Sequence, residues 1–271
     1  MTSLANCLIY STFQDSQFSP LPRVLAKMLA SSILRNHPEV ELIFGRSNVG
    51  PHSRPLFKVG RSGLIECDDP LSIGHKTPFR EWIDPVKYEW IIFVDSGCLV
   101  LRNLDLLLQR NADLVWAPIL NCPIRNHRFN GFLSPLELDA SFTSPYPVSR
   151  PWYAAASPSL WAVRGECYTH VMDVWNSLLT HPTANRCAAS FRLHSSWNRL
   201  LLDSQLRIKP IEKGEVSFPT FDGITFLDWK DSALICVNDW PITTQAQFLQ
   251  AVFYGFYYGD TSGLFLDILE V

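Results

Sequence analysis

The pattern of apolar and polar positions predicts short buried strands separated by helices. The run from Trp90 to Val94 is wholly apolar and rich in β-branched and aromatic residues, yet it is too short for a free-standing helix. We therefore expect a strand that is buried on both faces. Further strands are predicted at residues 7–10, 39–44, 64–66, 113–118, 206–210 and 233–237.

Helical spacing of apolar residues follows several of these strands. Residues 21–35 place apolar side chains three and four positions apart, and Pro22 suits a first helical turn. Other helices are predicted at residues 78–83, 103–109, 165–178, 190–202 and 243–258. The order strand, helix, strand at the start of the chain predicts a parallel strand pair with a right-handed crossover, and therefore an α/β protein.

A carboxylate stands where the central apolar strand stops. Asp95-Ser96-Gly97 directly follows the strand, and ligand crevices of open α/β sheets lie just beyond the carboxyl ends of the strands. A short apolar segment then leads to Arg102-Asn103-Leu104, which opens a leucine-rich helical pattern. The segment at residue 95 is therefore the first candidate for a binding site.

This arrangement resembles the glycosyltransferase A fold of the nucleotide-diphospho-sugar transferases, and most closely the glycogenin-like and related galactosyltransferases. In those families a strand ends in Asp-x-Asp and a helix follows near Arg-(Asn/Asp)-Leu, which Arg102-Asn103-Leu104 matches. The resemblance implies a mixed, mainly parallel sheet flanked by helices, in a single domain over residues 1–271. Its nucleotide-binding half would cover about 1–118, and its acceptor and sugar half about 119–271.

The resemblance also implies a set of residues for the donor. The first strand and its loop would line the base pocket, two basic residues before the central strand would face the sugar nucleotide, and the helix at 190–202 would approach the sugar. The donor-binding candidates are Tyr10, Ser11, Thr12, Lys76, Arg80, Asp95, Ser96, Gly97 and Asn198. Ordinary core and surface positions explain several of them equally well; no catalytic base is identified.

The span from 121 to 151 is a long irregular excursion, which in a compact domain usually serves an active site or an acceptor. It carries Arg125, His127 and Arg128 close together. Such a basic cluster beside a diphosphate would stabilise the charge that builds on the leaving phosphate. We take these three residues as phosphate candidates.

A divalent cation commonly neutralises the departing diphosphate in such a transfer. Here Gly97 stands where the second Asp of the motif is expected. Asp239 occurs where the relatives carry a metal-binding His, and Asp is a competent oxygen ligand for Mn²⁺ or Mg²⁺. Asp95 and Asp239 are thus the metal candidates; the alternatives are that Arg and Lys supply the positive charge or that transfer activity is lost.

Composition limits the partners and the compartment. A net charge of −3 and 18% charged residues provide no basic face for nucleic acid. Seven scattered cysteines without a C-x-x-C pair favour reduced thiols in a cytoplasmic protein. We expect no signal peptide and no transmembrane segment. The aromatic-rich helix at 243–258 is expected either to dock on the domain or to pair with another subunit in a homo-oligomer.

Three hypotheses for function remain. The first is a glycosyltransferase that moves a sugar from a nucleoside-diphosphate sugar, with UDP as the favoured nucleotide, to a glycan or protein acceptor. The second is a catalytically silent relative that binds a sugar nucleotide or a protein partner. The third is an unrelated α/β enzyme whose strand happens to end in Asp95.

Overall fold

The structure is a computed structural model, and the chain divides into two compact units. It describes residues 4–14, 19–47, 63–67, 83–108, 111–123, 154–181, 189–201, 205–211, 215–217, 232–237 and 242–258. Unit 1 comprises Met1–Pro70, Phe93–Leu106 and Gly214–Val271, and unit 2 comprises Leu71–Ile92 and Leu107–Lys213. The expected single domain, with halves meeting near residue 118, stays a prediction.

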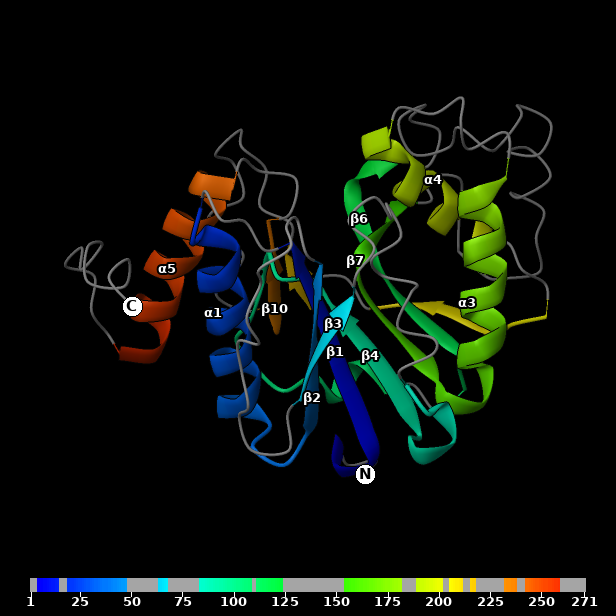
Figure 1. Ribbon diagram of the computed structural model, residues 1–271, viewed down its shortest axis with the longest axis horizontal. Helices are drawn as coiled ribbons and strands as arrows, with labels where there is room; N and C mark the ends of the chain where they lie inside the picture. The colour runs from blue at the N-terminus through cyan, green and yellow to red at the C-terminus, as the bar shows by residue number, and fades with distance from the viewer. Residues whose placement is uncertain are drawn as a thin grey trace. The chain divides into compact units, whose positions relative to one another are not determined.

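Unit 1 begins with the predicted parallel strands. After a 3-10 turn η1 (Leu4–Asn6), strand β1 (Cys7–Gln14) pairs in parallel with β2 (Glu41–Ser47), which pairs in parallel with β3 (Gly63–Cys67). Helix α1 (Leu21–Asn36) connects the first two strands and packs on β1 (Figure 1). The predicted strand–helix–strand opening is confirmed.

One boundary in this opening is wrong. Residues 11–13 were expected in a polar loop, whereas they continue β1, and Ser11 and Thr12 pair with Phe44 and Gly45 of β2. All three are buried, and the ring of Phe13 lies 6.5 Å from that of Phe44 between centroids. Pairing with the neighbouring strand and burial outweigh the polarity of two hydroxyl side chains.

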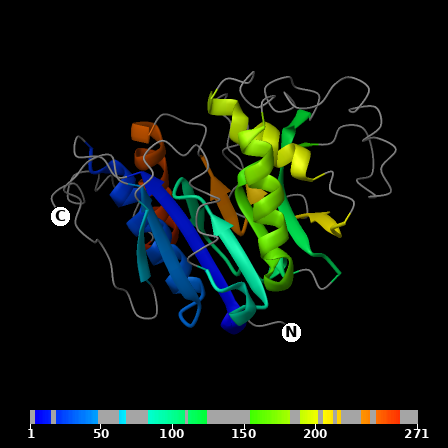
Figure 2. The ribbon, with the colours of Figure 1, turned by 45° about the vertical axis from the view of Figure 1, so that its right-hand side comes forward.

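A second, smaller sheet completes unit 1. Strand β10 (Leu234–Cys236) pairs antiparallel with β5 (Cys98–Val100) and in parallel with β9 (Val216–Ser217). Helix α5 (Ile242–Tyr258) lies beside α1 and also packs on β5 (Figures 1 and 2). Leu99, Ile235 and buried residues of both helices form one apolar core.

Unit 2 contains the antiparallel part of the fold. Strand β6 (Leu114–Pro123) pairs antiparallel with β7 (Ala154–Arg164) and in parallel with β8 (Ile208–Pro210). Helices α3 (Gly165–Thr180) and α4 (Ala189–Leu200) pack on each other and on β7. Between them lies a cluster of three buried tryptophans, with ring centroids 4.6 to 6.0 Å apart: Trp161, Trp175 and Trp197.

The central apolar run forms strand β4 (Trp90–Val94), preceded by a 3-10 turn η3 (Pro85–Lys87). Every residue of β4 is buried, which confirms the predicted strand with two buried faces. Among the described residues at 101–108, the expected helix at 103–109 is only a 3-10 turn, η4 (Asp105–Leu107). The Asn103 side chain bonds the backbone and carboxylate of Asp105, and such local bonds favour a turn over a helix.

The architecture is therefore α/β with a mixed sheet flanked by helices. The large sheet runs in the order β3-β2-β1 in unit 1 and β7-β6-β8 in unit 2, and the division between the units falls within β4, after Ile92. The expectation of a mainly parallel sheet is wrong, because the long β6–β7 pairing is antiparallel. An antiparallel return strand needs no helical crossover, and apolar runs alone do not distinguish the two directions.

Gly165 lies where the neighbouring backbone leaves no room for a side chain. It begins α3, and its N–H donates to the carbonyl oxygen of Glu89 at 3.0 Å. A Cβ here would lie 2.1 Å from the carbonyl oxygen of Tyr88 and 2.4 Å from that of Pro85. Both obstacles are backbone atoms, so they do not yield as a flexible side chain would.

We expect Gly165→Ala to lower the free energy of unfolding by at least about 2 kcal/mol, because the methyl group forces the α3 terminus away from residues 85–89. Urea unfolding followed by tryptophan fluorescence measures this change. Thr169→Ala, at an exposed position of the same helix, is the control and is expected to change stability by less than about 0.5 kcal/mol. Equal effects of the two substitutions would contradict the steric explanation.

Candidate functional site

Asp95 lies in a tight turn that joins β4 to β5. The N–H of Cys98 donates to the carbonyl oxygen of Asp95 at 3.0 Å, which closes a β-turn. The N–H of Gly97 also donates to the Asp95 carboxylate oxygen Oδ1 at 3.3 Å. Asp95 and Ser96 are half-buried, whereas Gly97 is buried. The carboxylate is thereby held at the surface in a defined direction.

The end of β10 runs alongside this turn. The N–H of Val237 donates to the carbonyl oxygen of Gly97 at 3.0 Å, and Cys236 lies opposite Cys98. Asp239 lies outside the described residues, but it follows Val237 by two positions in the chain.

Side chains of α1 and α5 hold the outer edge of β5. The N–H of Val100 donates to Ser32 Oγ at 3.1 Å, and the Tyr257 hydroxyl donates to the Val100 carbonyl oxygen at 2.5 Å. Asn36 Nδ2 in turn donates to the Tyr257 hydroxyl oxygen at 2.8 Å. Burial raises the pKa of Tyr257, so the phenol stays protonated and remains a donor. Both backbone groups of Val100 are thus satisfied by helix side chains.

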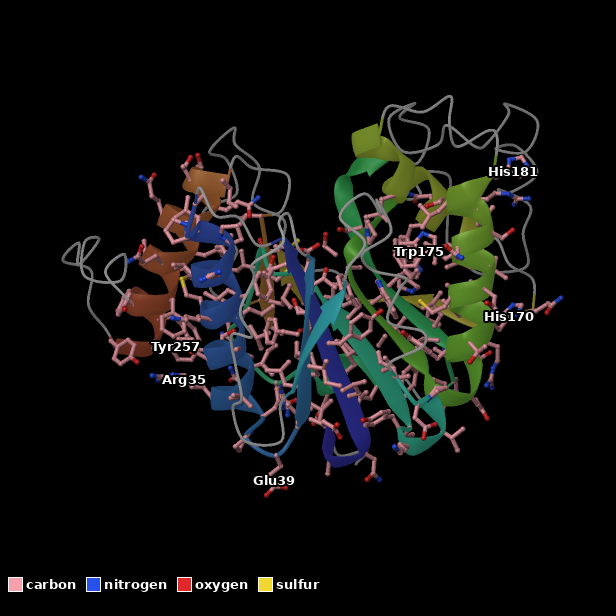
Figure 3. All side chains as sticks on the ribbon, viewed as in Figure 1. Arg35, Glu39, His170, Trp175, His181 and Tyr257 are labelled. Atoms are coloured by element: carbon pink, nitrogen blue, oxygen red, sulfur yellow. The ribbon has the colours of Figure 1, made fainter. Side chains whose placement is uncertain are left out.

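An aromatic and cationic contact fixes the C-terminal end of α5 on α1. The Arg35 guanidinium lies over the rings of Tyr257 and Tyr258, at 5.1 and 4.8 Å from their centroids, and donates to the Tyr258 hydroxyl (Figure 3). Such cation–π contacts contribute roughly 0.5–1 kcal/mol at exposed sites. They place Tyr257 where its hydroxyl reaches β5.

His37 supports the segment that follows β5. It caps the C-terminus of α1, it is 8% exposed, and its Nε2 accepts a hydrogen bond from the N–H of Leu104 at 3.0 Å. Acceptance requires the neutral imidazole. Burial lowers the pKa of His37, and the Asp105 carboxylate opposes this change in part. Sequence reasoning missed His37, Ser32 and the role of Tyr257, because their partners are backbone groups.

Three of the residues expected to bind the sugar-nucleotide donor lie on β1. Tyr10, Ser11 and Thr12 are all buried. The Tyr10 ring packs against Phe93 with centroids 5.0 Å apart, so it is part of the core of unit 1. In the described part of the chain, Ser11 Oγ has no hydrogen-bond partner. A buried hydroxyl of this kind is uncommon and leaves a polar position on the strand.

Asn198 lies on α4, in unit 2, and is fully buried. Its neighbours Ser196 and Trp197 are also buried, and Ser196 Oγ accepts a hydrogen bond from Trp175 Nε1 at 2.9 Å. The remaining candidates lie outside the described residues: Lys76, Arg80, Arg125, His127, Arg128 and Asp239.

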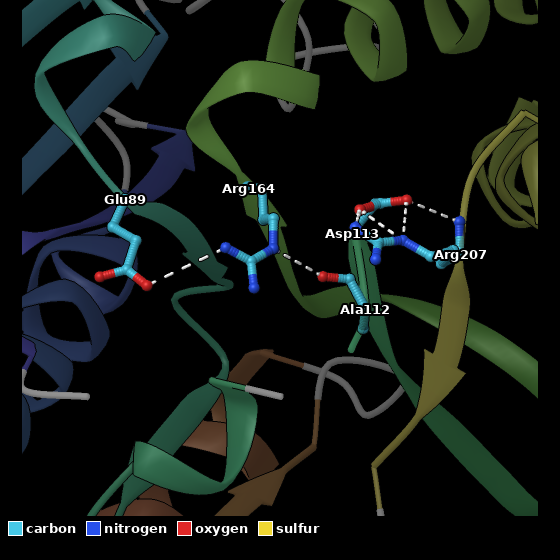
Figure 4. Close-up of polar contacts among 5 residues, drawn as sticks. All are labelled: Glu89, Ala112, Asp113, Arg164 and Arg207. Carbon is cyan, nitrogen blue, oxygen red and sulfur yellow. Dashed lines mark hydrogen bonds and ion pairs between the residues drawn. The ribbon is translucent and has the colours of Figure 1, made fainter. Parts of the chain in front are cut away.

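One group of potential metal ligands occurs in the part of the chain that the structure describes. Asp113, Glu166 and Cys167 in unit 2 bring ligand atoms within 4.8 Å of one another. The Asp113 carboxylate, however, accepts hydrogen bonds from the backbone N–H of Arg207 at 2.8 Å and from its guanidinium (Figure 4). This bonding lowers the pKa of Asp113, whereas burial raises that of the Cys167 thiol. We assign the carboxylate to the Arg207 ion pair.

Arg164 forms a second polar link in unit 2. Its Nε donates to the carbonyl oxygen of Ala112 at 2.9 Å, and its guanidinium lies 4.0 Å from the Glu89 carboxylate (Figure 4). The same guanidinium stacks over the Trp90 ring at 4.9 Å from the centroid. These contacts join residues 89–90 to the end of β7 and give Arg164 a structural role.

Comparison with known proteins does not identify a family. No protein-family model matches the chain, and no curated protein matches it significantly. Within the described helices, none has the length and apolar character needed to cross a membrane.

We expect Tyr257→Phe to destabilise unit 1 by about 1–2 kcal/mol, because it removes the donor to the carbonyl oxygen of Val100. Amide hydrogen exchange of the peptide containing residues 98–104 should become faster. Gln247→Ala, at an exposed position of the same helix, is the control and should leave that peptide unchanged. Unchanged exchange in Tyr257→Phe would show that its hydroxyl does not hold β5.

The stability of unit 1 should depend on the protonation of His37. Because the folded state lowers the pKa of His37, the unfolded chain binds the proton more readily, and stability falls as the pH drops below about 6.5. The unsubstituted chain should therefore exceed His37→Gln in free energy of unfolding by a constant amount above that pH. On acidification this difference should shrink by at most about 1.4 kcal/mol per pH unit. Parallel unfolding curves of both proteins from pH 8 to pH 5 test this, and a constant difference would contradict it.

Proposed function

We propose that this chain is a glycosyltransferase of the A fold, which transfers a sugar from a nucleoside-diphosphate sugar, with UDP as the favoured nucleotide. The observation that carries the proposal is the position of Asp95. Its carboxylate follows the buried strand β4 and lies in a turn whose Gly97 carbonyl is bonded to Val237, at the end of β10. The turn that contains Asp95 is thus bonded to the residue that follows β10, two positions before Asp239 in the sequence.

The strand pattern supports the same proposal. The proposal is supported by the parallel β1–β2–β3 group and by the buried strand β4, which ends just before Asp95. Ligands of open α/β sheets bind beyond the carboxyl ends of the strands. The unpartnered hydroxyl of Ser11 adds a polar position on β1, next to β4 in the order of strands.

The donor chemistry of the site fits a hard divalent cation. Asp95 and Asp239 would supply carboxylate oxygens to Mn²⁺ or Mg²⁺, together with the diphosphate. Bound there, the cation would neutralise charge on the leaving nucleoside diphosphate. The role of this chain's own residues would be to hold the diphosphate at the turn, with Asp95 oriented by the Gly97 N–H.

A catalytically silent relative is the second candidate function. Gly97 favours it, because this residue has no side chain to act as the second carboxylate of the motif. Its carbonyl and N–H are both engaged within the turn and with β10. Such a protein would bind the nucleotide or a protein partner without releasing the sugar.

Asp95→Asn separates the charge of Asp95 from its structural role. The amide oxygen still accepts the bond from the Gly97 N–H, so the turn is kept, but the negative charge for a cation is lost. We expect calorimetric titration to show UDP binding that requires Mn²⁺ and weakens at least tenfold in Asp95→Asn and Asp95→Ala. GDP is titrated in parallel as the competing nucleotide.

Glu39→Ala is the matched control, because it removes an exposed carboxylate from unit 1 in the connection between α1 and β2 (Figure 3). It should bind UDP as the unsubstituted chain does. Binding of UDP that ignores both Mn²⁺ and Asp95, without hydrolysis of UDP-sugars, would favour the silent relative. Absence of binding to either nucleotide would overturn the proposal.

A further inference from the structure

Two cysteines face each other next to the Asp95 turn. Cys98 is the first residue of β5 and Cys236 the last of β10, and they are direct partners in the antiparallel register. Both cysteines are reduced and both are buried, with exposures of 1% and 3%. They belong to the same unit, although they lie far apart in the sequence.

The hydrogen bonds assign this pair to the closer of the two antiparallel geometries. The N–H of Val237 donates to the carbonyl oxygen of Gly97, and the N–H of Leu101 donates to that of Ala233, so Gly97–Val237 and Leu101–Ala233 are hydrogen-bonded pairs. Along an antiparallel ladder, hydrogen-bonded and non-hydrogen-bonded pairs alternate. The Cys98 N–H instead donates to Asp95, within the turn. Cys98 and Cys236 therefore form a non-hydrogen-bonded pair, for which the Cα atoms are typically about 4.5 Å apart.

The two thiols also lie on the same face of the small sheet. Successive side chains of a strand alternate between faces, and direct cross-strand partners share a face. Leu99 and Ile235 belong to the core formed with α1 and α5. Cys98 and Cys236 consequently point together to the other face.

We propose that Cys98 and Cys236 form a reversible cross-strand disulfide that locks the Asp95 turn to the end of β10. The oxidant is a low-molecular-weight disulfide of the glutathione type. One thiolate attacks it, forming a mixed disulfide and releasing one small thiol. The second thiolate then attacks the protein sulfur of that mixed disulfide, so the protein S–S bond forms and the second small thiol leaves. Two protein S–H bonds are lost, and the oxidant gains the two electrons and two protons.

The geometry allows this bond. A Cα separation of about 4.5 Å lies within the range that disulfides span. A small thiol in excess breaks the bond again by the reverse of the same two exchange steps. Both strands have only three residues, so local opening at their ends admits the oxidant.

The consequence for nucleotide binding rests on the proposed function. The bond would fix residues 95–98 against 236–237, the two segments that lead to the candidate carboxylates. It would therefore control how far the two segments separate around a diphosphate. Formation of the bond itself requires no ligand.

The test is oxidation of the reduced full chain with glutathione disulfide, followed by alkylation under denaturing conditions and peptide mapping. We expect the number of alkylated thiols to fall by two, with one linked peptide pair that contains Cys98 and Cys236 and is two hydrogen atoms lighter than its parts. A reducing agent should restore both thiols. Hydrogen exchange across residues 95–98 should slow at least tenfold in the oxidised chain.

Cys98→Ser and Cys236→Ser should each abolish the linked pair, while Cys167→Ser in unit 2 should retain it. The mapping of the unsubstituted chain needs no variant, so a variant that fails to fold does not weaken it. Stable glutathione adducts on Cys98 or Cys236, or their full alkylation after treatment, would overturn the proposal.

UDP titration of the reduced and oxidised chains separates the two proposals. Dissociation constants that differ at least threefold would support redox control of the site, and equal constants would overturn that control. Absence of UDP binding in both forms would overturn the proposed function, whereas the disulfide would still be judged by the peptide map alone.

Discussion

The backbone groups of the short strand β5 impose the constraint on which the candidate site depends. A three-residue strand at a sheet edge leaves polar groups that must find partners when they are buried. On one side β10 provides them, and on the other Ser32 and Tyr257 bind both groups of Val100. The same contacts hold the strand that follows the Asp95 turn. Helices α1 and α5 thereby position a loop that neither of them contains.

The backbone of Gly97 joins the Asp95 turn to β10. Its N–H donates to the Asp95 carboxylate, and its carbonyl oxygen accepts from the N–H of Val237. An Asp at this position would add a second ligand, as in Asp-x-Asp, but here the neighbouring carboxylate would come from the segment after β10. A site with one carboxylate in the turn before β5 and one in the segment after β10 would respond to the spacing of β5 and β10, which connects the proposed metal site to the proposed Cys98–Cys236 bond.

The sequence could predict elements whose signal is local. The wholly apolar run of β4, the helical spacing of α1 and the parallel β1–β2 pair all follow from short-range patterns, and the structure confirms them. Prediction from the sequence failed where pairing with a neighbouring strand determines the structure. Ser11 reads as a loop residue because of its hydroxyl, yet strand pairing buries it, and the antiparallel direction of β7 has no counterpart in its apolar pattern. The proposed roles of Asn198, Lys76 and Arg80 in binding the sugar-nucleotide donor stay predictions.

By itself the sequence determined an α/β chain with a carboxylate after its most buried strand, because burial and secondary structure depend on residue type and spacing. Only the tertiary structure decided that β10 lies beside the Asp95 turn and that Cys98 faces Cys236. It also decided that His37 and Tyr257 hold the chain around β5. Those contacts join segments far apart in the sequence through backbone hydrogen bonds, and backbone groups are the same in every residue, so no pattern of side chains records which of them will pair.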